Sequence, residues 1–241
     1  LVLRTQETFK KVLKHIMKYN KFIIDEKKLA NSINTTSFDD LKKIEHLVNY
    51  IGFEPNPDEC SRLNKKSESS RRFLKERYFQ TAIGGMKSRK NLYVTHQPGC
   101  SSFLKPNKKL LSFYGRESWF KVVEEIQADT ITLKDFCLCK HQPSPDFLKI
   151  DIEGDEYSSL INLNEKKLSK IRILVLEIHD LRNLRSKFFF KTFSDLIYRL
   201  SNYFYFCHLH PNNTSKIKKI GNLRIPDMLE LTLINKSRVK K

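Results

Sequence analysis

Two apolar runs in the second half of the chain each end in acidic side chains. Residues 147–150 are followed by Asp151 and Glu153. Residues 171–178 contain Glu177 near their end and are followed by His179 and Asp180. In an open α/β sheet, ligands bind just beyond the carboxyl ends of the strands. Two buried strands that finish in acids at one edge therefore predict a functional site.

Strand-like and helix-like patterns alternate along the rest of the chain. The predicted strands cover residues 22–24, 49–54, 78–83, 91–95, 120–126, 147–150, 171–178, 203–208 and 228–234, and the predicted helices cover 5–19, 38–49, 58–66, 132–137 and 191–201. This alternation predicts an α/β fold with a mainly parallel sheet and helices on both faces. We expect the last strand, 228–234, to return antiparallel beside its predecessor.

Composition narrows the class of protein. A hydrophobic content of 39% and seventeen Phe exclude a disordered chain. No apolar run approaches the roughly 20 residues of a membrane span, and the N-terminus shows no signal-peptide pattern. The five Cys lack metal-ligand spacing, so we expect free thiols and a cytoplasmic location. Because the chain begins at Leu1 rather than Met, we expect a trimmed product or a fragment.

The net charge of +18 has two interpretations. Gathered on one face, it would attract nucleic acid, anionic lipid or a phosphorylated substrate. Spread evenly, it is a lysine-rich solvated surface. Basic residues recur along the whole chain without a base-stacking aromatic pattern, which favours the solvated surface, and a nucleic-acid partner is not favoured.

Glu54 ends the predicted strand 49–54, directly before Pro55-Asn-Pro57. An acid in this place suits hydrogen bonds from the two hydroxyls of a ribose, as after the second strand of nucleotide-binding Rossmann sites. The alternative is a surface acid at the start of the next helix, for which we expect Asp58 to be the cap and which we expect to run to about Lys66. The fixed turn between the two prolines favours the ribose role.

The acids at the two strand ends have competing interpretations as well. Asp151 and Glu153 suit cofactor orientation, general-base catalysis or cation binding. Helix capping is the alternative, and it would explain Glu153, Asp155 and Glu156 more readily than Asp151. Glu177 and His179 fall on one face of their strand. They could form an acid/base pair or half of a metal site, or they could be the salt-bridged end of a core strand. The pair His208 and His210 has the same spacing, but no further ligand accompanies it, so no metal is expected.

These segments together resemble the FkbM-type S-adenosylmethionine-dependent methyltransferases. The segment Lys149-Ile-Asp-Ile-Glu-Gly-Asp-Glu156 is similar to their Lys-Ile-Asp-(Val/Ile)-Glu-Gly-x-Glu signature. Six further segments follow in order: Gly52-Phe-Glu-Pro-Asn-Pro57, Thr81-Ala-Ile-Gly84, Pro98-Gly-Cys-Ser-Ser102, Thr132-Leu-Lys-Asp-Phe136, Leu176-Glu-Ile-His179, and the closing pair His208–Asn213 with Ile225–Thr232. The resemblance runs from about residue 48 to residue 234.

The resemblance implies a Rossmann-like fold and methyl transfer from S-adenosylmethionine to a hydroxyl oxygen of a sugar or other small molecule. Residues 48–235 would form the methyltransferase core, preceded by an N-terminal helical segment and first-strand region (1–47) and followed by a basic tail (236–241). The implied roles are as follows: Asp25, Glu54, Asp151, Ser101 and Ser102 bind the cofactor; Asp151, Glu177 and His179 are catalytic, with His179 as the base; and Glu153 and His179 contact the acceptor.

One family motif differs in this chain. The family's first strand leads into an Asp-x-Gly-(Ala/Cys)-x-x-Gly loop, whose glycines allow the backbone to approach the cofactor. Here Ile23-Ile-Asp25 has suitable spacing, but no glycine precedes Gly52. Two alternatives to the enzyme therefore stay open, namely a cofactor-free binding module with the same fold and an RNA-binding protein or RNA methyltransferase.

Overall fold

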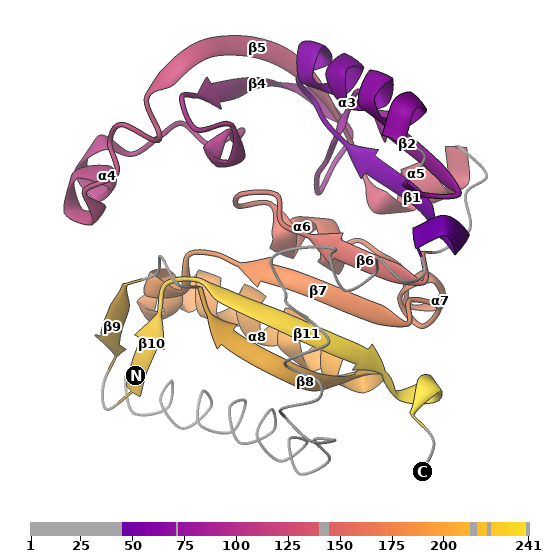
Figure 1. The fold of residues 1–241 in the computed structure, drawn as a ribbon. Helices are drawn as coiled ribbons and strands as arrows, with labels where there is room; N and C mark the ends of the chain where they lie inside the picture. The colour runs from indigo at the N-terminus through magenta and orange to yellow at the C-terminus, as the bar shows by residue number, and fades with distance from the viewer. Residues whose placement is uncertain (1–44, 71, 140–144, 213–215, 221–222, 240–241) are drawn as a thin grey trace.

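A computed structural model of the chain describes residues 45–70, 72–139, 145–212, 216–220 and 223–239. Within these ranges the protein is a mixed α/β structure with an upper part, residues 45–139, above a lower part, residues 145–239 (Figure 1). The strands are β1 (Asn49–Phe53), β2 (Lys75–Phe79), β3 (Ala82–Ile83), β4 (Ser88–Thr95), β5 (Val122–Ile131), β6 (Phe147–Ile150), β7 (Ile173–Ile178), β8 (Phe204–Pro211), β9 (Ile217–Ile220), β10 (Leu223–Pro226) and β11 (Leu229–Asn235). The α-helices are α3 (Pro57–Ser70), α4 (Lys108–Tyr114), α5 (Leu133–Cys139), α6 (Glu156–Ile161), α7 (Glu165–Leu168) and α8 (Lys187–Tyr203), and the short 3-10 helices are η3 (Glu45–Leu47), η4 (Pro98–Cys100), η5 (Leu181–Arg185) and η6 (Lys236–Arg238).

In the upper part, β1 and β2 pair in parallel and α3 packs against β2. The helix begins at Pro57, and its cap is Asn56, whose Oδ1 accepts hydrogen bonds from the backbone N–H groups of Asp58 (3.0 Å) and Glu59 (3.2 Å). The expectation that Asp58 caps this helix was therefore wrong by two residues. Proline at the first helical position suits this start, because its missing N–H would have no partner there.

The remaining strands of the upper part form one small sheet with the order β3-β5-β4. Strand β3 is parallel to β5, and β4 is antiparallel to it over eight residues. Strand β5 extends to Ile131, beyond the predicted end at residue 126, because β4 supplies backbone partners along this length.

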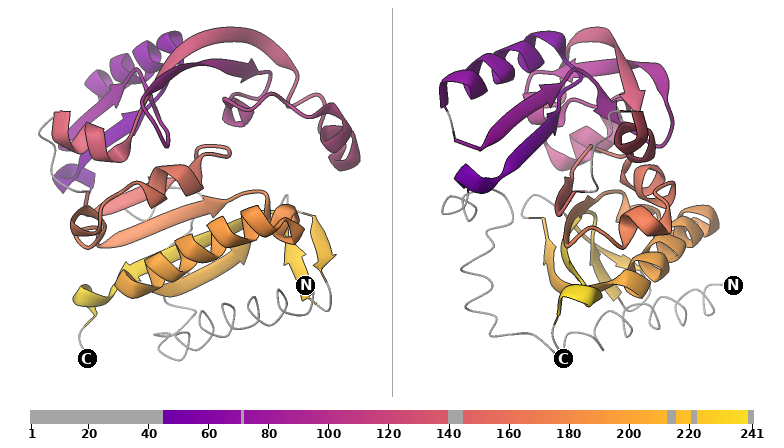
Figure 2. Two further views of the ribbon diagram at one scale, coloured as in Figure 1. Left: turned by 180° about the vertical axis from the view of Figure 1, so that it is seen from behind. Right: turned by 90° about the vertical axis from the view of Figure 1, so that its right-hand side faces the viewer.

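The lower part has a four-stranded sheet with the order β6-β7-β11-β8 (Figure 1). Strands β6 and β7 are parallel, whereas β11 is antiparallel to both of its neighbours. The predicted antiparallel pairing of the last strand with its predecessor is confirmed. Helix α8 covers one face of this sheet (Figure 2), and Leu174, Leu200 and Leu233, each 0% exposed, lie at the centre of the core.

The sheet arrangement differs from the expected mainly parallel sheet. The described residues form four separate sheets, in which parallel and antiparallel pairs are mixed. Strands β9 and β10 follow each other directly as an antiparallel hairpin, whereas η4 and α4 lie between β4 and β5, and β11 returns beside β7 after α8 and β8. Antiparallel neighbours need no crossover helix. The hairpin β9–β10 was not predicted from the sequence. The predicted helix 5–19 and strand 22–24 fall outside the described residues, and the 38–49 helix is seen only as η3 at residues 45–47.

The turn at Gly84 and Gly85 joins the upper part to the lower part. The Gly85 N–H donates to Asp155 Oδ2 (3.1 Å), and Asn162 Nδ2 donates to the Gly85 carbonyl (2.7 Å). A Cβ atom on Gly85 would lie 2.4 Å from Cβ of Ser158. Glycine is therefore required here because α6 approaches the turn closely.

Candidate active site

The ends of β6 and β7 bring two carboxyl groups together. Ile150 pairs with Leu176 in the parallel register, so the next residues, Asp151 and Glu177, are neighbours. Their carboxyl groups share a hydrogen bond, which requires one proton between them. Lys149 Nζ lies 3.1 Å from Asp151 Oδ2 on the other side.

The proton of this carboxyl pair belongs mainly to Glu177. Burial and the hydrogen bond with Asp151 raise the pKa of Glu177. Burial also opposes ionisation of Asp151, but the hydrogen bond from Glu177 and the charge of Lys149 outweigh it and lower the Asp151 pKa. At neutral pH, Asp151 is thus the ionised member, with Glu177 donating to it.

The loop after β6 turns through two left-handed residues. Glu153 has φ of 53° and Gly154 has φ of 120°. Oε1 of Glu156 holds the turn by accepting hydrogen bonds from the N–H groups of Ile152 (3.3 Å) and Gly154 (3.0 Å). A left-handed glutamate is uncommon and carries backbone strain of the kind that gathers at functional sites.

His179 lies between two glutamates of this loop. Its Nδ1 is 3.1 Å from Glu156 Oε1, and its Nε2 is 3.6 Å from Glu153 Oε2. Burial disfavours the charged ring, but the hydrogen bond to Glu156 and the surrounding carboxylates outweigh it and raise the pKa of His179 to about 9. Burial raises the pKa of Glu153 to about 7, against the opposing effect of His179.

Three site residues were not predicted from the sequence. Glu156 was taken only as a helix-capping acid, but it is 1% exposed and holds both the loop and His179. Asn212 donates from Nδ2 to Glu177 Oε1 (2.6 Å) and Glu230 Oε1 (3.4 Å), and Glu230 faces Glu177 across the β7–β11 ladder. The pairing registers of β7 with β11 and of β11 with β8 bring Glu177, Glu230 and the segment after β8 together. Such registers join distant segments, so no local sequence pattern predicts these contacts.

Glu54 directly follows β1 and is half-buried. Its Oε1 accepts a hydrogen bond from the Asn56 N–H (2.8 Å), and burial raises its pKa. Within the part of the chain described, no hydrogen bond to the second carboxylate oxygen, Oε2, is found. Asp25 lies outside the described residues.

The two predicted serines differ in position. Ser102 Oγ donates to the carbonyl of Glu153 (2.9 Å), so the segment after η4 lies against the left-handed loop. Ser101 Oγ instead accepts from the Thr95 N–H (3.1 Å) and fixes the loop after β4.

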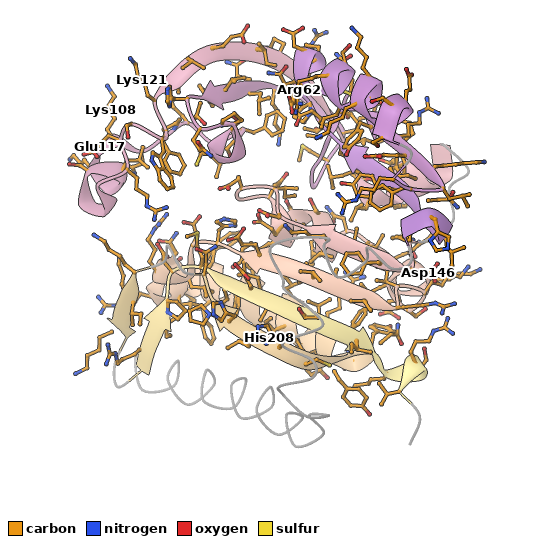
Figure 3. The ribbon with its side chains drawn as sticks, viewed as in Figure 1. Arg62, Lys108, Glu117, Lys121, Asp146 and His208 are labelled. Atoms are coloured by element: carbon orange, nitrogen blue, oxygen red, sulfur yellow. The ribbon has the colours of Figure 1, made fainter. Side chains whose placement is uncertain are left out.

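The histidine pair of β8 lies on the lower sheet, where Figure 3 labels His208. The rings of His208 and His210 stack with centroids 5.9 Å apart. Among the described residues, no group of three or more His, Cys, Asp or Glu side chains is placed to hold a metal ion.

A hollow of about 600 Å³ lies on the upper part. It is lined by Phe79, Gln80, Thr81, Lys87, Ser88, Asp129, Thr130 and Ile131. None of the predicted site residues lines it, but the N–H of Glu54 donates to the carbonyl of its lining residue Phe79 (3.0 Å).

The model of the FkbM methyltransferase domain matches residues 30–207, about three quarters of the chain. The chain belongs to the FkbM methyltransferase family. The match contains Glu54, Asp151, Glu153, Glu177 and His179, but it begins after Asp25 and ends before His208 and β11. Searches of curated proteins and of solved structures gave no match.

The FkbM domain supports a methyltransferase activity in general terms. In the described part of the chain, no helix is both long enough and apolar enough to cross a membrane.

Proposed function

We propose that this FkbM-family protein transfers a methyl group from S-adenosylmethionine to a hydroxyl oxygen of a sugar or other small molecule. The observation that carries the proposal is the cluster of Asp151, Glu153, Glu177 and His179 at the ends of two parallel strands. This is the edge of an α/β sheet where ligands bind.

The described residues fit the cofactor at Glu54. Its carboxyl group ends a parallel strand, is half-buried, and uses only one oxygen on the backbone turn. Oε2 can therefore accept a hydrogen bond from a ribose hydroxyl. Asp151, ionised beside Lys149, suits the cationic methionine part, with Asp25 as a further contact. The serines have a smaller part in this proposal, since both hydroxyls bond within the protein.

The bound cofactor supplies an electrophilic methyl group, and the protein aligns the acceptor oxygen with it. We assign proton transfer to Glu153 rather than to His179. A pKa of about 9 keeps His179 protonated at neutral pH, so its ring has no free lone pair for a proton. The pKa of Glu153, about 7, suits a general base. Glu153 would accept the proton of the acceptor hydroxyl as that oxygen bonds to the methyl carbon, and the carbon–sulfur bond would break to release S-adenosylhomocysteine.

The proposal extends to the fold and the cellular setting. In this proposal the parallel pairs β1–β2 and β6–β7 belong to one Rossmann-like core over residues 48–235. Glu54 directly follows β1 and Asp151 directly follows β6, so each pair ends in a carboxyl group proposed to bind the cofactor. Among the described residues, Cys60, Cys100 and Cys207 are free thiols, which supports a cytoplasmic location.

A cofactor-free binding module is the second candidate, because no glycine precedes Gly52. Calorimetric titration with S-adenosylmethionine and S-adenosylhomocysteine separates the two candidates. We expect micromolar binding by the wild type and affinity about 10- to 100-fold weaker for Glu54→Ala, the loss that a hydrogen bond to a charged group causes.

Glu68→Ala is the matched control, since Glu68 lies on α3 and its side chain is exposed. Its affinity should equal that of the wild type. A folded wild type that binds neither compound would overturn the enzyme proposal in favour of the binding module, and equal losses in both variants would remove Glu54 from the cofactor site.

A further inference from the structure

The end of α4 fixes the position of one arginine. The N–H of Gly115 bonds to the Ser112 carbonyl (3.1 Å), and the N–H of Arg116 bonds to the Leu111 carbonyl (3.1 Å). With Gly115 at φ of 65°, these two bonds form a Schellman motif that ends the helix. The backbone of Arg116 is therefore held in one place, at the end of the upper part where Figure 3 labels Lys108, Glu117 and Lys121.

Trp119 turns back over this arginine. Its N–H bonds to the Arg116 carbonyl (3.1 Å), and the Arg116 guanidinium carbon lies 4.6 Å from the centre of the Trp119 ring. The tryptophan is 45% exposed. An exposed indole with a guanidinium beside it offers both a stacking surface and a charged hydrogen-bond donor.

Short connections join this pair to the candidate active site. The Gln97 N–H bonds to the Trp119 carbonyl (3.0 Å), and the Cys100 N–H bonds to the Gln97 carbonyl (2.9 Å). Two residues on, Ser102 donates to the carbonyl of Glu153. Burial and the charge of Glu153 raise the pKa of the Cys100 thiol, whereas Arg116 opposes them, so both charges act on the same side chain.

Among the described residues, the charge of Arg116 has no acidic partner in an ion pair, and Glu117 is exposed. A second cation lies in the same region, where Lys90 Nζ is 5.9 Å from the ring centre of Phe103, next to Ser102. This side of the site is thus basic and aromatic, whereas the strand ends are acidic.

We propose that the methyl acceptor is an anionic sugar, whose ring stacks on Trp119 and whose carboxylate or phosphate binds Arg116. This inference rests on the proposed methyl transfer to a hydroxyl, and it names the class of compound that carries that hydroxyl. The sugar would extend from the acidic strand ends, where its hydroxyl reacts, to the basic side, where its charge is bound.

The test measures sugar binding by ligand-observed NMR, without cofactor, for glucuronate, glucose 6-phosphate and glucose. We expect millimolar binding of at least one anionic sugar and at least tenfold weaker binding of glucose, in line with the value of one charge-assisted hydrogen bond. Arg116→Gln should reduce the affinity for the two anionic sugars to the affinity for glucose. Trp119→Ala should weaken the binding of all three sugars. Lys121→Gln, an exposed lysine of the same segment, is the control and should leave binding unchanged.

The two anions identify the charged group, because a preference for glucuronate indicates a carboxylate and a preference for glucose 6-phosphate a phosphate. Equal binding of glucose and the anions would overturn the inference, as would equal effects of Arg116→Gln and Lys121→Gln. An RNA oligonucleotide is the alternative ligand. If it binds tightly without any sugar and Arg116→Gln abolishes that binding, Arg116 and Trp119 bind a nucleic acid and the sugar proposal is wrong. Since the cofactor titration is separate, failure here leaves the methyltransferase proposal intact.

Discussion

His179 should make the stability of the protein depend on pH in the alkaline range. Its pKa is about 9 in the folded protein against an ordinary value of 6.5. At about 1.4 kcal/mol for each pH unit, this difference corresponds to about 3 kcal/mol. The imidazole is 12% exposed, so solvent screening reduces this value little.

The sign follows from the raised pKa. The stabilisation is fully present below about pH 6.5, where the ring is charged in the folded and unfolded states, and it is lost as the pH rises through about 9. Most of it remains at about pH 7. We therefore expect the wild type to lose more stability than His179→Gln between about pH 7 and pH 10, by roughly 2–3 kcal/mol.

Urea unfolding at several pH values measures this difference. His96→Gln, at an exposed histidine, should follow the wild type. Repeating the comparison in a Glu153→Gln background removes the titration of Glu153. The protein with His179 should still lose more stability at alkaline pH than the His179→Gln variant, because Glu156 still accepts a hydrogen bond from His179 Nδ1. If wild type and His179→Gln lose equal stability over this range, the ring is not held as a cation by its carboxylates and the reasoning fails.

Two further predictions concern the loop and the turn that support the site. Gly85→Ala should lower the free energy of unfolding by about 1–3 kcal/mol, because the new Cβ would meet Ser158, whereas Gly99→Ala, with open space around it, should change urea unfolding little. With an accepted sugar in hand, Glu153→Gln should lower kcat by about 100- to 10,000-fold while calorimetry shows an unchanged cofactor affinity; an unchanged kcat would exclude Glu153 as the base.

Local patterns were sufficient for much of the fold. The strand patterns before Glu54 and Asp151 predicted β1 and β6 with their acids directly after them, because short runs rich in β-branched and aromatic residues favour strands. The amphipathic pattern over 191–201 predicted the centre of α8, which extends from Lys187 to Tyr203. Helix ends were less certain, since capping depends on single side chains such as Asn56.

The sequence by itself determined the family and the residue types of the site, because motif spacing is a property of the chain alone. Only the tertiary structure decided their protonation. Whether His179 or Glu153 accepts a proton depends on burial and on Glu156, a residue that sequence analysis took as a helix cap. The connection of Trp119 through Gln97 and Ser102 to the loop of Glu153 was likewise decided by contacts between distant segments. Such contacts arise from packing, which no local pattern specifies.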